Sequence, residues 1–147
     1  MIVTAITEKY ISGFFHFYNS FRLNNDFPIT CYLINFSGEK AKLMTRQFPD
    51  VTFRVYMGNF KPPEQKWQPS GILKVTYLKG LFLRKEAERS KENKKVIWID
   101  PSKLIMGKVD FMYDLLNDYE WVGIGRPGKD ENRRFFAGMF GFNRGDQ

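Results

Sequence analysis

The chain has 147 residues, 43% of them hydrophobic and 17% aromatic, which is enough apolar material for a domain with a core and argues against disorder. The single cysteine, Cys31, excludes an internal disulfide and fits a reducing, cytoplasmic compartment. The formal charge of +7 favours anionic partners such as nucleotide phosphates, nucleic acid or a membrane surface. No apolar run approaches the roughly 20 residues of a transmembrane segment, and the N-terminal sequence MIVTAITEKY lacks the features of a signal peptide.

The first half of the chain predicts strands that alternate with helices. Strands are expected over residues 2–6, 29–36 and 51–56, and the last of these alternates apolar and polar residues, so it is expected to be half exposed near a sheet edge. A helix after residue 10 is predicted by apolar residues at helical spacing: Ile11, Phe14, Phe15, Tyr18 and Phe21. A second helix is expected to run from a cap at Ser37 through Gln47, with inward-facing Leu43, Met44 and Phe48.

The second half predicts the same alternation. A long loop over residues 57–69 precedes the longest expected helix, which starts with a cap at Ser70 and ends near Ser90. A shorter helix is expected from Asp110 to Leu116. Strands are expected over residues 96–99, 121–124 and 135–142, and a basic loop rich in glycine and proline is expected between the last two.

Val96–Ile99 is the segment that is predicted to form the central strand of the sheet. Its four residues are all apolar, which suits a central strand that is buried on both faces of a parallel sheet. Asp100 closes the strand, and an acid at the carboxyl end of such a strand lies where open α/β sheets bind ligands. A simple polar strand end that faces water is the alternative. Pro101 stops the hydrogen-bond ladder because it has no N–H to donate.

Strands that alternate with helices predict βαβ units, and therefore an α/β fold with a Rossmann-like, mostly parallel sheet flanked by helices. No internal repeat and no domain boundary is visible, so residues 1–147 are expected to form a single domain. Neither a Walker A sequence nor a G-x-G-x-x-G motif occurs, so the standard phosphate-binding loops are missing. One cysteine and one histidine cannot supply a zinc site.

Four stretches of the chain carry a family resemblance: VTAITEKY, Leu73-Lys74-Val75, VIWIDPSKLIMGKVD and FFAGMFGFN. In order and approximate spacing they resemble the nucleotide-diphospho-sugar glycosyltransferases of the A-type fold, and most closely the retaining group that includes glycogenin. The third stretch is the most specific, because it stands where the family has a strand that ends in D-x-D. The resemblance covers almost the whole chain and implies an A-type glycosyltransferase fold with a donor-binding core.

A degenerate D-x-D motif is the main departure from the family pattern. Two acids at i and i+2 of an extended backbone point the same way and can bridge Mn²⁺ or Mg²⁺ to a diphosphate. The metal then offsets the charge that develops on the leaving group. This chain reads Asp100-Pro101-Ser102, and the family's later His ligand and His-x-x-Gly-x-x-Lys segment have no counterpart. The resemblance therefore implies a weak or absent metal site at Asp100.

The resemblance also assigns binding roles. Nucleotide contacts are implied for Thr4, Ala5, Thr7, Tyr10 and Asp100, with Tyr10 stacked on the base and the two threonines and Ala5 lining the base and ribose. Contacts with the donor sugar or its phosphates are implied for Lys74, Ser102, Arg126, Ala137 and Gly138. No catalytic residue is assigned. The plain alternatives are a helix-start aromatic for Tyr10, an exposed helix lysine for Lys74, strand-packing residues for Ala137 and Gly138, and a solvated basic loop around Arg126.

Three functions follow as hypotheses. The first is a glycosyltransferase of the hexosyltransferase type, which binds a nucleotide-sugar, by resemblance a UDP-sugar, and transfers the sugar to a glycan, protein or lipid acceptor. The second is a non-catalytic nucleotide-sugar-binding module that has lost its metal site, in a chain that is either minimal or truncated. The third is a nucleic-acid-binding α/β domain, which ranks lowest because the positive residues are scattered along the chain and the aromatic residues mostly occupy core-periodic positions.

Overall fold

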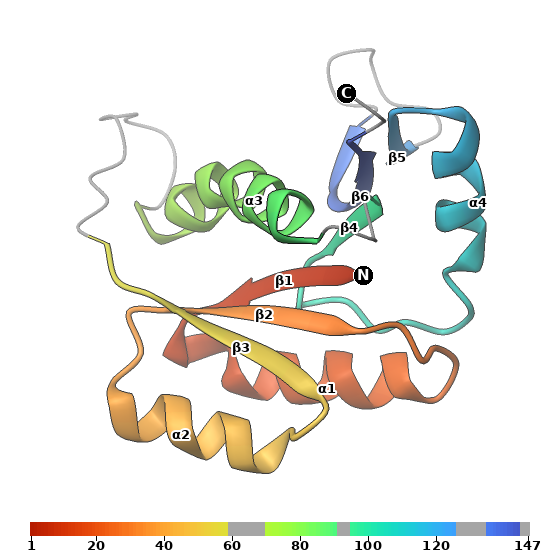
Figure 1. The fold of residues 1–147 in the computed structure, drawn as a ribbon. Helices are drawn as coiled ribbons and strands as arrows, with labels where there is room; N and C mark the ends of the chain where they lie inside the picture. The colour runs from red at the N-terminus through yellow and green to blue at the C-terminus, as the bar shows by residue number, and fades with distance from the viewer. Residues whose placement is uncertain (59–69, 91–94, 126–134, 145–147) are drawn as a thin grey trace.

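A computed structural model of the chain describes residues 1–58, 70–90, 95–125 and 135–144. Within these ranges six strands form one sheet in the order β3-β2-β1-β4-β6-β5 (Figure 1). The strands are β1 (Ile2–Ile6), β2 (Ile29–Ile34), β3 (Val51–Tyr56), β4 (Lys95–Ile99), β5 (Trp121–Gly125) and β6 (Phe135–Asn143). The helices are η1 (Glu8–Tyr10), α1 (Ile11–Arg22), α2 (Gly38–Gln47), α3 (Ser70–Arg89) and α4 (Asp110–Asp118).

The sheet is mostly parallel, as the alternation of strands and helices predicts. β1 pairs in parallel with β2 and with β4, and β2 pairs in parallel with β3. β6 is antiparallel to both of its neighbours, β4 and β5, so an antiparallel hairpin completes one side of the sheet. The expected loops after residue 57 and after residue 125 fall largely on residues outside this description.

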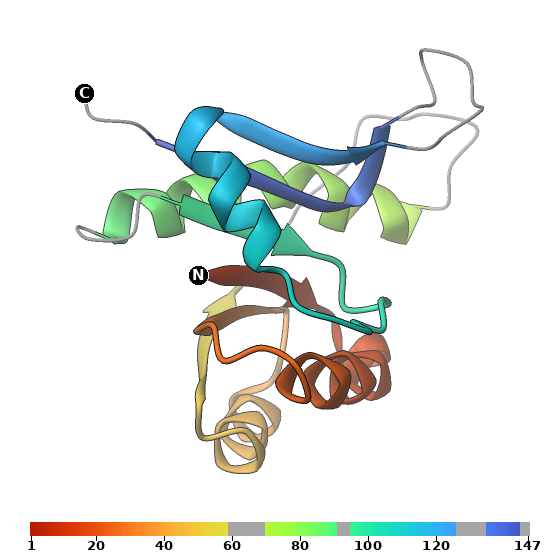
Figure 2. The ribbon, with the colours of Figure 1, turned by 90° about the vertical axis from the view of Figure 1, so that its right-hand side faces the viewer.

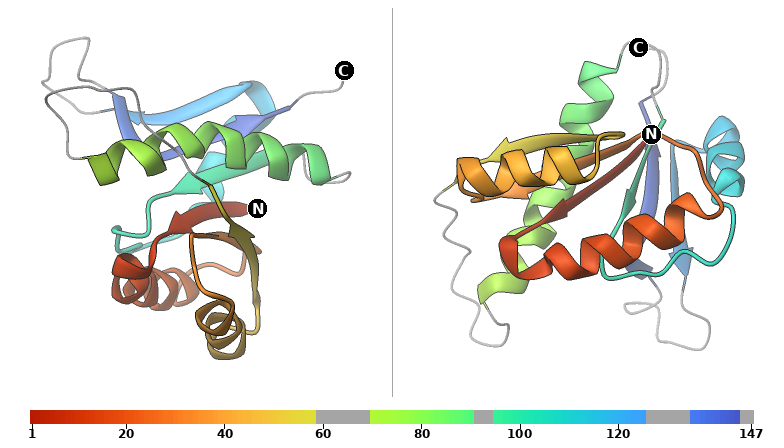
Figure 3. Two further views of the ribbon diagram at one scale, coloured as in Figure 1. Left: turned by 90° about the vertical axis from the view of Figure 1, so that its left-hand side faces the viewer. Right: turned by 90° about the horizontal axis from the view of Figure 1, so that it is seen from below.

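Helices cover both faces of the sheet. α1, α2 and α4 lie on one face, where Phe17, Met44 and Leu116 contribute to a single core (Figure 3). α3 alone, among the described helices, lies on the opposite face, where Leu78 and Phe82 pack against β1, β2 and β4. None of the described helices has the length and apolarity needed to cross a bilayer.

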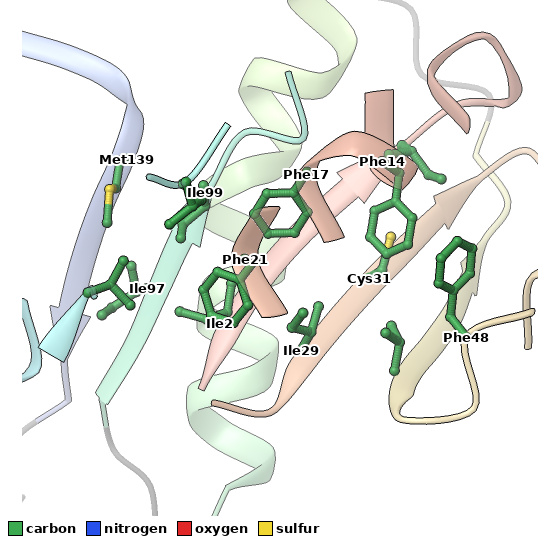
Figure 4. Packing of buried hydrophobic residues seen from close by; sticks show 14 of the residues in the cluster. Ile2, Phe14, Phe17, Phe21, Ile29, Cys31, Phe48, Ile97, Ile99 and Met139 are labelled. Atoms are coloured by element: carbon green, nitrogen blue, oxygen red, sulfur yellow. The ribbon is translucent and has the colours of Figure 1, made fainter. Parts of the chain in front are cut away.

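β4 lies inside the sheet and is buried on both faces, which confirms the prediction from its unbroken apolar run. Ile97 and Ile99 belong to the core that α1, α2 and α4 cover (Figure 4). Val96 and Trp98 belong to the core on the α3 side of the sheet. β3 is a half-exposed edge strand, as its pattern predicts. The alternation holds only in its first half, because Val55 is exposed whereas Arg54 and Tyr56 are partly buried. Cys31 is buried in β2, and burial raises the pKa of its thiol well above the usual range, as expected of an inert core cysteine.

The inward face of α1 differs from the expected stripe. Phe14, Phe17 and Phe21 are fully buried, and Figure 4 shows their rings directed at the strands. The expected inward residue Phe15 is largely exposed, because positions 14, 17 and 21 share one face of the helix and position 15 lies beside it. In α2, Leu43 was expected to face inward but is exposed, whereas Met44 and Phe48 are buried as expected.

The expected helix starts are partly correct. Ser37 caps α2, since its hydroxyl accepts a hydrogen bond from the Lys40 backbone N–H at 3.4 Å. Asp110 is the first residue of α4 rather than its cap, a position held by Val109. Ser70 was also expected to be a cap, but it is the first residue of α3.

A connector over residues 100–109 links β4 to α4 and runs along α1 (Figure 2). The Ser20 hydroxyl accepts a hydrogen bond from the Ile105 N–H at 3.0 Å. The Asn25 side chain accepts from the Val109 N–H at 2.8 Å and donates to the Gly107 carbonyl at 3.0 Å. The apolar run expected after Asp100 therefore forms an anchored connector, in which Ile105 alone is buried among residues 104–106.

Candidate functional site

The candidate site lies at the edge of the sheet where the parallel strands β1, β2, β3 and β4 end. Because parallel strands all point the same way, their carboxyl ends meet along one edge, and open α/β sheets bind ligands there. Thr7 follows β1, Asn35 follows β2, Met57 follows β3 and Asp100 follows β4. β1 and β4 are neighbours, so the fold places the two predicted nucleotide-binding segments side by side.

Asp100 is held by two donors on the α3 side of the sheet. Its Oδ1 atom accepts a hydrogen bond from the Trp98 indole N–H at 2.7 Å and forms an ion pair with the Lys79 ammonium, also at 2.7 Å. The Lys79 nitrogen lies 5.4 Å from the centre of the Trp98 ring, within reach of a cation–π contact. The Lys79 side chain is 10% exposed and that of Asp100 is 25% exposed, so only Asp100 offers appreciable surface to a ligand.

Lys79 is the site residue that sequence reasoning missed. A signal was present, because apolar Phe82 and Leu83 lie three and four residues further along the same helix and both are buried. A lysine on the inward face of a helix needs an anionic partner, since an unpaired buried ammonium is costly. The sequence could not identify Asp100 as that partner, because the two residues lie on separate elements.

Gly138 lies directly beside Asp100. The Asp100 N–H donates to the Gly138 carbonyl at 2.7 Å, which joins the end of β4 to β6. The structure thus brings together two residues that the family resemblance placed at the donor site. Ala137 precedes Gly138 in β6, but its side chain lies outside the described part of the chain.

The chain turns immediately after Asp100. The Lys103 N–H donates to the Asp100 carbonyl at 3.1 Å, and residues 101 and 102 form a turn in which Pro101 is buried and Ser102 is exposed. The backbone is therefore not extended here, and the i, i+2 geometry of a D-x-D motif does not apply to Ser102. A serine hydroxyl in this turn supplies no negative charge to a cation.

The residues that the structure describes at this edge do not fit a divalent metal. Mn²⁺ and Mg²⁺ prefer several hard oxygen ligands, usually including one or two carboxylates. Over the described ranges, no group of three or more His, Cys, Asp or Glu side chains could hold an ion. The Asp100 carboxylate already receives the Lys79 ammonium.

The predicted residues of the β1 segment divide into buried and accessible ones. Thr4 and Ala5 are buried within the sheet, and the Thr4 hydroxyl has no hydrogen-bond partner among the described residues. Thr7 is partly exposed at the cap position of η1, where its side chain makes no capping bond. Tyr10 ends η1 with 49% of its surface exposed. Thr7 and Tyr10 are therefore the members of this group whose side chains can meet a ligand.

Two further polar residues shape this edge. Asn35 has a positive φ of 55°, a conformation that asparagine tolerates, and its side-chain oxygen accepts from the Gly58 N–H at 3.1 Å. Glu8 pairs with Lys40 at 2.5 Å, and hydrogen bonding to Lys40 lowers the pKa of the Glu8 carboxyl. These contacts tie the ends of β2 and β3 together and connect η1 to α2.

The remaining predicted sugar- or phosphate-binding residues are Lys74 and Arg126. Lys74 belongs to α3, but its side chain lies outside the described residues. Arg126 lies outside them entirely.

Comparison with solved structures identifies the fold class. The glycosyltransferase GlyE of Streptococcus pneumoniae matches 97% of this chain with a TM-score of 0.58 and 14% identity. Mouse xyloside xylosyltransferase 1 matches 97% with a TM-score of 0.58 and 11% identity, and a putative glucose-1-phosphate thymidylyltransferase from Bacillus anthracis matches 97% with 0.50 and 10%. This chain has an α/β fold of the A type found in glycosyltransferases.

The match covers different shares of these proteins. The chain spans 33% of GlyE, 66% of the mouse xylosyltransferase and 70% of the thymidylyltransferase. No protein-family model and no curated protein sequence matches it. The similarity therefore establishes a fold that corresponds to about a third of GlyE.

Proposed function

We propose that the chain binds a nucleotide-diphospho-sugar over the carboxyl ends of β1 and β4 and transfers the sugar to an acceptor. The observation that carries this proposal is the position of Asp100, at the end of a buried parallel strand and in contact with Gly138, within a glycosyltransferase-like fold. A UDP-sugar is the expected donor by family resemblance. A glycan, a protein and a lipid are all open as acceptors.

Each exposed residue at this edge has a chemical role in the proposal. Tyr10 offers a half-exposed ring that a nucleobase can stack on. Thr7 offers a hydroxyl without a capping bond. The Asp100 carboxylate, oriented by Lys79 and Trp98, is suited to accept hydrogen bonds from ribose hydroxyls.

Tyr10 provides the direct test of the nucleotide site. We expect Tyr10→Ala to weaken binding of a nucleoside diphosphate by about 1–3 kcal/mol, the usual energy of base–aromatic stacking. Calorimetric titration with a panel of nucleotide-sugars would measure the change and identify the base. Tyr119→Ala is the matched control, because Tyr119 is an exposed tyrosine at the end of α4. Equal affinities for the two folded variants would remove Tyr10 from the site.

A binding module without catalysis is the second candidate. It is favoured by the turn that displaces Ser102 and by the pairing of Asp100 with Lys79, which together remove the features of a metal-assisted site. Release of UDP from a bound UDP-sugar, measured with and without candidate acceptors, separates the two functions. Tight binding without release in any acceptor mixture would favour the binding module.

A further inference from the structure

The Lys79 ammonium lies against Asp100 Oδ1 and takes the place of a cation at that oxygen. Its nitrogen lies 2.7 Å from Asp100 Oδ1, which also accepts from the Trp98 N–H at 2.7 Å. Hydrogen bonds between ionised groups are short and strong, so this oxygen is already well satisfied. The Trp98 ring beneath the ammonium holds the lysine in place.

A metal ion at the same oxygen would lie close to this ammonium. Two positive charges a few ångströms apart repel strongly in a partly buried site, where water screens them poorly. Neither Ser102 in its turn nor any acidic cluster of the described ranges offers compensating negative charge. Entry of a metal at this oxygen would therefore require the Lys79 side chain to leave its buried position.

The same ion pair removes the need for a metal at this edge. A free carboxylate would repel the diphosphate of a nucleotide-sugar, and a bridging cation normally cancels that repulsion. Here a side chain of the protein cancels it. We propose that this site binds a nucleoside diphosphate without a divalent cation, with Lys79 as the positioning residue that neutralises Asp100. This inference rests on the proposed nucleotide-sugar function.

The test uses the whole chain and UDP as the probe. Calorimetry would give the UDP affinity in Mn²⁺ and in EDTA at fixed ionic strength. We expect the two affinities to agree within about twofold. UDP binding in Mn²⁺ but not in EDTA would overturn this inference alone. Absence of UDP binding in both media would overturn it together with the proposed function.

Substitution of Lys79 should create a dependence on metal. In Lys79→Met the Asp100 carboxylate loses its counter-charge, so we expect UDP affinity in EDTA to fall about tenfold and Mn²⁺ to restore most of it. Lys79→Arg keeps the charge and should keep metal-independent binding. Lys42→Met is the control, because it removes one charge from an exposed site on α2, which packs against β3 rather than β4. Similar metal dependence in Lys42→Met and Lys79→Met would overturn the role of Lys79.

Asp100→Asn keeps the inference falsifiable if Lys79→Met fails to fold, which thermal unfolding would show. Asparagine preserves the side-chain shape and an acceptor for Trp98 but removes the charge that a metal would need. We expect its ratio of UDP affinities in Mn²⁺ and EDTA to stay near one, like that of the unmodified chain. If Mn²⁺ increases the UDP affinity of the unmodified chain but not that of Asp100→Asn, then Asp100 is a metal ligand and the proposal is overturned.

Discussion

At the scale of single residues, the buried Glu86 carboxylate brings several hydrogen-bond donors together. Glu86 lies on α3 with 1% of its side chain exposed, and its Oε1 accepts from Tyr32 at 2.6 Å and from Arg54 and Arg89, each at 2.7 Å. Burial opposes ionisation, but hydrogen bonds from Arg54, Tyr32 and Arg89 outweigh it and lower the pKa of Glu86. The network joins α3 to β2 and β3.

Glu86→Gln should therefore destabilise the fold. We expect a loss of about 1–3 kcal/mol in the free energy of unfolding, because the arginines lose their shared counter-charge but can still reach water. Urea unfolding would measure it. Glu88→Gln is the control, since Glu88 pairs with Arg84 on the exposed side of the same helix and should matter much less. An equal loss in both variants would contradict the importance of the buried network.

The same residue predicts a dependence on pH. Because folding lowers the pKa of Glu86, its contribution to stability is fully present above the unfolded pKa of about 4.3 and is lost as the pH falls through the folded pKa. The difference in unfolding free energy between the unmodified chain and Glu86→Gln should therefore be largest above about pH 5 and shrink below about pH 4. A difference that is constant or grows on acidification would contradict this assignment.

At the scale of elements, the connector between β4 and α4 is anchored to α1 by a buried side chain. Asn25 is buried at the end of α1 and holds the connector through Gly107 and the Val109 N–H. Asn25→Ala should cost about 2–3 kcal/mol of stability, because it leaves a buried N–H unpaired. It should also speed hydrogen exchange at the Val109 amide. Asn24→Ala is the control, because Asn24 is exposed and its substitution should change neither the stability nor the exchange of the Val109 amide. Equal effects of the two substitutions on these quantities would contradict the anchoring role of Asn25.

The elements show which features the sequence could predict. An unbroken apolar run was enough to predict a buried central β4, and the serine before Gly38 was enough to predict the start of α2, because both signals are local. α1 was harder, since Phe14 is followed by both Phe15 and Phe17, and the inward stripe could be read through Phe15 rather than Phe17. The ion pair between Lys79 and Asp100 depends on tertiary packing, which no local pattern specifies.

At the scale of the whole molecule, strand order should control how local stability is distributed. β1, β2 and β4 are flanked on both sides and buried, whereas β3 and β5 form the sheet edges. Amides of Val3, Leu33 and Trp98 should therefore exchange with solvent only through global unfolding, and those at the outer edge of β3 far sooner. Native-state hydrogen exchange measured at increasing urea would test this. Slower exchange on β3 than on β1 would contradict the strand order.

The position of β1 in the sheet has a consequence for biosynthesis. β1 pairs with two strands, β2 and β4. β2 is the next strand in the chain, whereas Ile97 of β4, the partner of Ile2, lies 95 positions after it (97 − 2). At about 5–20 residues per second, translation takes roughly 5–20 s to reach β4 after making β1. During that interval a half-sheet of β1, β2 and β3 carries an open apolar edge on the nascent chain. An unpaired strand edge is a template for pairing with another chain, so β1 is open to aggregation until β4 pairs with it.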